Sequence, residues 1–133
     1  MAPLSDDTRQ RLRECSQRLL RLHKALLDLQ RREYESDHLP PSSGTELLRL
    51  VLDHPDFAWL RTLSGLIVEI DDLASTDELA TEDDADAKLK RVASLLHTSN
   101  GEPGAFNSRY REALQASPDV VVAHGQVMAL FPG

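Results

Sequence analysis

The chain has 133 residues, of which 41% are hydrophobic and 28% are charged. This length is typical of one domain, and the balance of apolar and charged residues excludes wholesale disorder. The formal net charge of −7 argues against a general nucleic-acid-binding protein, because such proteins need an excess of basic residues. We therefore expect one globular domain over residues 1–133, with nucleic acid an unlikely partner.

A long helix is expected first, from Ser5 or Asp6 to about Glu35. Apolar residues recur there in steps of three and four, which is the spacing of one helix face. Ser5 or Asp6 can cap the helix start. A helix of this length can project beyond the bundle or form one side of a dimer. The seam consists of Leu12, Cys15, Leu19, Leu22, Leu26 and Leu29, and the stripe is widened by Leu20, Leu27 and Tyr34.

A loop with two prolines and a glycine, residues 38–44, separates this helix from a short second helix. Ser43 and Glu46 have the spacing of a capping box, which marks the start of that helix. Pro55 ends it, because proline cannot continue a helix from within.

Pro55 also fits the first position of a third helix, with Asp53 or His54 as its cap. This helix, which extends to about Leu73, is the most apolar of the chain and is therefore expected to be central. Gly65 lies within it at a cost of about 1 kcal/mol relative to alanine.

An acidic linker over residues 75–81 leads to a fourth helix, for which Thr81 and Asp84 resemble a capping box. The segment 99–104 is the clearest break in the chain. A short helix follows the break, and Ser117 caps a last, apolar helix that the bundle or another chain must bury. No stretch alternates long enough to be a strand. We therefore predict an all-α fold, a compact bundle of five or six helices with a long N-terminal helix and with Leu22, Leu26, Trp59, Leu63 and Ile67 in its core.

Catalytic motifs are absent from the sequence in recognisable form. Ser64 and Gly65 lie in a helical pattern and lack the preceding glycine of a nucleophile elbow. Gly101 and Gly104 lack the lysine and hydroxyl residues of a phosphate-binding loop. We assign no catalytic residue and no cofactor, and the sequence leans away from an enzyme without excluding one.

Histidines offer the one alternative chemistry. Di-metal helical bundles use two Glu-x-x-His pairs, and this chain has one such pair, Glu35 and His38. His23, His97 and His124 lie on different expected helices and would have to converge to hold a metal ion. A metal-binding or small-ligand-binding bundle that uses these three histidines is therefore the alternative to the interpretation that follows.

The charges are unevenly distributed along the chain. Residues 9–32 hold eight bases and two acids, whereas residues 69–86 hold nine acids and no base. Such faces are usually solvated or attract one another within the fold or across a dimer. The leading hypothesis is a non-enzymatic helical interaction module that forms a homo-oligomer or docks a protein partner. Its candidate partner-binding residues are Arg11, Arg18, Arg21 and Arg32.

The single cysteine, Cys15, excludes a disulfide within the chain and suits a reducing compartment. The first seven residues carry no apolar stretch of the kind a secretory signal needs. No run approaches the roughly 18 apolar residues of a membrane span. We expect a cytoplasmic protein.

Residues 56–71 (DFAWLRTLSGLIVEID), together with residues 19–28 upstream, resemble a group of small uncharacterised bacterial proteins. The similarity extends over most of the chain, including residues 110–123. This resemblance implies a bacterial cytosolic helical protein and carries over no catalytic residue.

Overall fold

The computed structural model describes residues 3–39, 41–75, 79–97 and 105–131, which form six α-helices and one 3₁₀ helix. Within these ranges the only bridge of β type is an isolated one between Pro3 and Thr81. The prediction of an all-α fold with a long N-terminal helix is confirmed. The helices are α1 (Asp6–Asp37), α2 (Gly44–Asp53), η1 (Pro55–Leu60), α3 (Arg61–Ser75), α4 (Glu82–Leu96), α5 (Ala105–Ala116) and α6 (Pro118–Met128).

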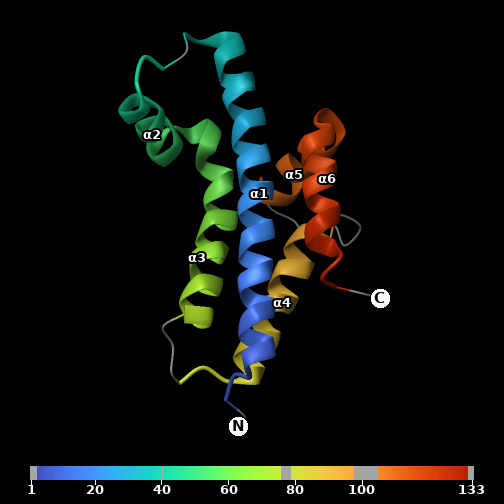
Figure 1. Ribbon diagram of the computed structural model, residues 1–133. Helices are drawn as coiled ribbons and strands as arrows, with labels where there is room; N and C mark the ends of the chain where they lie inside the picture. Colours follow the sequence, from blue (N-terminus) through green and yellow to red (C-terminus); the bar gives the residue numbers. More distant parts are fainter. Residues whose placement is uncertain (1–2, 40, 76–78, 98–104, 132–133) are drawn as a thin grey trace.

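The central element is α1, which runs through most of the length of the molecule (Figure 1). It packs against α3 on one side and α6 on the other, with further contacts to η1 and α4. Beyond α3, at the end of the molecule where α1 finishes, lies α2, on the side of α1 away from α6 (Figure 1). Its main contact is with η1. None of the helices in the described ranges combines the length and apolar character that crossing a membrane requires.

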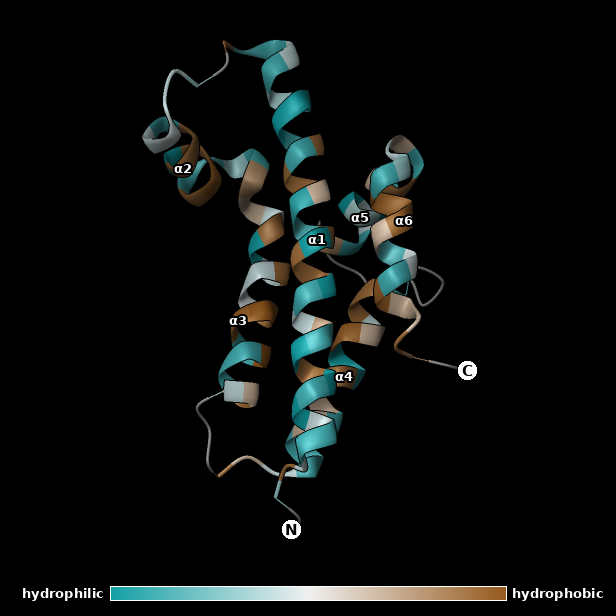
Figure 2. Ribbon diagram, viewed as in Figure 1, coloured by the Kyte–Doolittle hydropathy of each residue, from teal (hydrophilic) through white to brown (hydrophobic). Residues whose placement is uncertain are grey.

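The seam of α1 lies at the centre of the core. Figure 2 shows hydrophobic and hydrophilic segments following one another along α1. Leu29 at the end of the seam is only partly buried, and Leu20 lies outside the packed surface with 50% of its area exposed. The stripe is therefore narrower than the sequence indicated. The other predicted core residues, Trp59, Leu63 and Ile67, are buried, and the fully covered seam residues are Leu12, Cys15, Leu19, Leu22 and Leu26.

Three predicted helix starts are confirmed. The Ser5 hydroxyl accepts a hydrogen bond from the backbone of Thr8, and Ser117 caps α6 ahead of Pro118. Thr81 and Asp84 form a complete reciprocal capping box at the start of α4. These caps satisfy backbone N–H groups that have no partner within the helix.

The predicted capping box of α2 is only half formed. Ser43 caps the backbone N–H of Glu46, but the Glu46 carboxylate binds the backbone and hydroxyl of Ser42 instead of reaching Ser43. The neighbouring serine offers that carboxylate two donors, which makes it the better partner.

The predicted third helix is two elements rather than one. Pro55 does begin a helix capped by His54, but its first six residues form the 3₁₀ helix η1, and α3 starts at Arg61. A 3₁₀ helix has three residues per turn, so Phe57 and Leu60 lie on one side of it. Both are buried, so this side of η1 faces the core.

The last helix is covered on one face only. Val120, Ala123 and Val127 are buried, whereas Val121 and Val122 are exposed, so the bundle buries α6 only in part. The predicted break at 99–104 and part of the predicted acidic linker lie outside the described residues.

Candidate interaction surface

The helix α2 contains no fully buried residue. Leu50 and Val51 are half-buried against the core, but Leu48 and Leu52 are 58% and 56% exposed. These two leucines are one turn apart, so they form an apolar ridge on the outer side of the helix. Figure 2 shows α2, with both hydrophobic and hydrophilic segments, at the edge of the molecule and apart from the central helix α1.

Local hydrogen bonds preform α2 at both ends. Ser43 caps its start, and the Ser42 hydroxyl and backbone bind the Glu46 carboxylate, which lowers the pKa of that carboxyl. At the other end the Arg61 guanidinium donates to the backbone carbonyl of Leu52. An isolated helix of ten residues is marginal in water, so these contacts and η1 hold it in shape.

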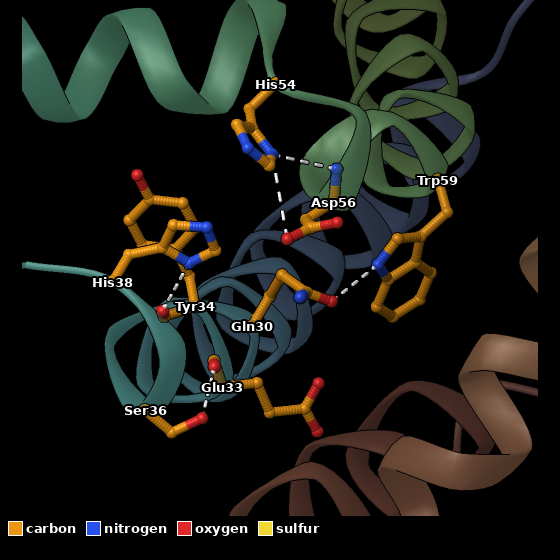
Figure 3. A network of polar contacts seen from close by, with 8 residues as sticks. All are labelled: Gln30, Glu33, Tyr34, Ser36, His38, His54, Asp56 and Trp59. Carbon is orange, nitrogen blue, oxygen red and sulfur yellow. Dashed lines mark hydrogen bonds and ion pairs between the residues drawn. The ribbon is translucent and has the colours of Figure 1, made fainter.

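An aromatic corner joins the end of α2 to the end of α1 (Figure 3). The Tyr34 ring stacks on His38 at 4.3 Å between centroids and meets the edge of His54 at 5.2 Å. His54 Nδ1 accepts a hydrogen bond from the Asp56 backbone at 3.1 Å and so caps η1. The corner fixes where α2 sits relative to α1.

The two histidines of this corner are poorly suited to bind one metal ion together. His38 Nδ1 donates to the Tyr34 carbonyl at 3.0 Å, which leaves its Nε2 lone pair free. Neutral His54, in contrast, carries its proton on Nε2, because its Nδ1 accepts from Asp56. His54 would have to give up its capping bond to become a ligand.

The structure does not bring the predicted histidine triad together as a metal site. His124 Nδ1 accepts a hydrogen bond from the Tyr110 hydroxyl at 2.7 Å. Burial lowers the pKa of His124, and the charge of His97 lowers it further. His23 lies on α1, where burial lowers its pKa. Among the described residues, no group of three His, Cys, Asp or Glu side chains is arranged to hold a metal ion.

The bond between Tyr110 and His124 was not foreseen from the sequence. Burial raises the pKa of the Tyr110 hydroxyl, so this group stays protonated and acts as the donor. The two residues are 14 positions apart on different helices, and only the packing of α5 against α6 pairs them.

Two of the four predicted partner-binding arginines are used within the fold. Arg11 donates to the Leu130 carbonyl at 3.1 Å, and Arg18 donates to the Gln126 carbonyl at 2.7 Å. Carbonyl groups at a helix end lack partners within the helix and favour a nearby positive charge. Arg18 therefore caps the C-terminal end of α6, and Arg11 binds the turn that follows the helix.

The other two, Arg21 and Arg32, lie in a groove of about 310 Å³ between α1 and α6. Small side chains of both helices line it, and Val122, 60% exposed, borders it. We call it the α1/α6 groove. Its lining residues are Arg21, Lys24, Ala25, Asp28, Arg32, Asp119, Val122, Ala123 and Gln126.

Several acids of the 69–86 segment are also used within the fold. Glu69 forms an ion pair with Lys88 at 3.1 Å, and Asp71 accepts from the hydroxyl of Ser16 on α1. Glu82 accepts hydrogen bonds from Thr8 and Ser5, which lower the pKa of its carboxyl. This segment therefore joins α3 and α4 to α1.

Cys15 is a core residue and not a reactive thiol. Burial raises its pKa to about 11, although the charges of Arg11 and Arg18 act in the opposite direction. The thiolate, which is the nucleophilic form, is therefore scarce at neutral pH.

No family model, curated protein or solved structure matches the chain. The resemblance of residues 56–71 to small bacterial proteins stays a prediction. The functional argument therefore depends on the surfaces described above.

Proposed function

We propose that this protein is a non-enzymatic helical interaction module of the cytoplasm that self-associates or docks a protein partner through α2. The observation that carries this proposal is the exposure of Leu48 and Leu52 on a helix that is already folded. Amphipathic helices bind partners by placing such residues, spaced by one turn, into an apolar groove. A preformed helix does not pay the ordering cost of a disordered segment on binding. The buried, unpaired Cys15 suits a reducing compartment.

The test compares untagged protein with a variant that carries Leu48→Gln and Leu52→Gln. Glutamine has nearly the helix propensity of leucine, so α2 keeps its shape while losing its apolar ridge. The matched control is Leu20→Gln, which removes a half-exposed leucine from α1. Native mass spectrometry of protein taken gently from its host measures what is bound.

We expect masses above the 14.8 kDa of the single chain for the unmodified protein and the control, and loss of these masses in the α2 variant. Complexes that survive both α2 substitutions would show that another surface carries the interaction. A bare single chain in all three samples, at every concentration measured, would also overturn the proposal.

A further inference from the structure

Two separate surfaces of this molecule carry charge patterns of opposite order. On the α1/α6 groove, Lys24, Asp28 and Arg32 follow one another at steps of four residues, in the order plus, minus, plus. All three are exposed, and none of them forms an ion pair within the described part of the chain. Steps of four place them in one row along α1.

The side of α2 next to Leu50 and His54 carries the opposite order. Glu46, Arg49 and Asp53 give minus, plus, minus at steps of three and four residues, and all three border one shallow surface. At 1.5 Å per residue this row is about 10.5 Å long, and the row on α1 is about 12 Å long. The two rows therefore match in order and nearly in length.

The apolar parts of the two surfaces also match. On α2 the ridge flanks the charged row, because Leu52 lies three residues after Arg49. On the groove, the exposed Val122 belongs to the same lining as the row on α1. Ala25 and Ala123 are small, so a third helix can come close to both α1 and α6.

The two surfaces cannot meet within one chain. In Figure 1 α2 lies beyond α3, whereas the groove lies on the other side of α1, against α6. We infer that α2 of one molecule docks into the α1/α6 groove of a second copy, with Arg49 opposite Asp28 and the two acids of α2 opposite Lys24 and Arg32. This inference rests on the proposed function and names its partner and contact residues.

Other occupants fit these surfaces less well. A membrane surface is disfavoured for α2, because anionic lipids attract basic helices and this one carries two acids and one base. Nucleic acid is disfavoured for the groove, where Asp28 and Asp119 interrupt the bases. One short helix buries less area than a standard interface, so self-association should be weak and should weaken further as salt is added.

The test exchanges the two central charges and measures the dissociation constant of self-association by sedimentation equilibrium. Protein concentrations up to about 1 mM are needed, because a small interface gives weak association. Asp28→Arg and Arg49→Glu each turn the central attraction into a repulsion, and each should weaken self-association about tenfold. The double variant restores opposite charges and should regain most of the lost affinity. Asp86→Arg, an exposed acid on α4 away from both surfaces, is the control and should leave association unchanged.

A second measurement locates the contact directly. Carbodiimide joins a lysine to a carboxylate with no spacer, and a mixture of ¹⁵N-labelled and unlabelled protein separates links between molecules from links within one. We expect a mixed-isotope link from Lys24 to Glu46 or Asp53.

The inference is wrong if the protein does not self-associate, if Asp28→Arg has no effect, or if Lys24 forms mixed links only to other carboxylates. A different protein bound through Leu48 and Leu52 would overturn the inference and leave the proposed function standing. If the variant with Leu48→Gln and Leu52→Gln binds its partner or itself as the unmodified protein does, both the proposed function and this inference are wrong.

Discussion

The hydrogen bond between the Trp59 indole and the Gln30 side chain gives the sharpest test of how the core is built. Trp59 Nε1 donates to Gln30 Oε1 at 2.9 Å, and both side chains are buried (Figure 3). Gln30→Met keeps the length of the side chain but removes the acceptor. The indole N–H then stays buried without a partner, which costs about 1–3 kcal/mol of unfolding free energy.

A double-mutant cycle isolates this bond. Trp59→Phe removes the donor, and the double variant leaves neither group unpaired. The losses of unfolding free energy in the two single variants, added together, should therefore exceed the loss in the double variant by about 1 kcal/mol. The assay is urea unfolding followed by far-UV circular dichroism, because Trp59 is the only tryptophan and its fluorescence disappears in half of the cycle. Additive costs, within about 0.3 kcal/mol, would refute the interpretation that the bond stabilises the junction of α1 and η1.

Three further predictions concern the core and its titratable groups. Leu26→Ala should cost about 2–5 kcal/mol in urea unfolding, whereas Leu20→Ala should cost less than about 1 kcal/mol because Leu20 is half-exposed. The folded-state pKa of His124 is lowered, so the unfolded chain binds more protons and stability should fall as pH drops below about 6.5. His124→Gln should flatten that slope, as thermal unfolding from pH 7 to pH 5 will show, and an unchanged slope would contradict the assignment. Cys15 should react slowly with a thiol reagent at pH 8 in the native state and rapidly in urea, because burial raises its pKa to about 11; equal rates would show that the site is open.

Local signals predicted the helices well because they act over a few residues. The spacing from Leu12 to Leu26 and the caps at Ser5, Thr81 and Ser117 each depend on neighbours within one or two turns. The change from 3₁₀ to α-helical winding at Arg61 has no comparable local signal in the sequence. For that reason the sequence indicated one helix where the structure has two.

The candidate surface was only partly predictable. The charge pattern predicts all four arginines as partner-binding residues. Arg21 and Arg32 line the groove. Arg11 and Arg18 bind carbonyl groups within the fold, and composition does not distinguish them from the other two. Their roles depend on carbonyl groups more than 100 residues away in the sequence. The exposure of Leu48 was equally hidden, because a leucine-rich helix has the same pattern whether or not another element covers it.

The bonds from α1 to the end of α6 also bear on the time course of biosynthesis. Arg11 and Leu130 are 119 residues apart, and Arg18 and Gln126 are 108 apart. At synthesis rates of about 5–20 residues per second, roughly 5–25 s pass between the appearance of one partner and the other. Throughout that interval the side of α1 that will meet α6 lacks α6 as a cover, whereas α3, which ends at Ser75, is complete about halfway through it. The nascent chain is therefore most prone to aggregation or to chaperone binding along this side, and the last helix to emerge ends that exposure.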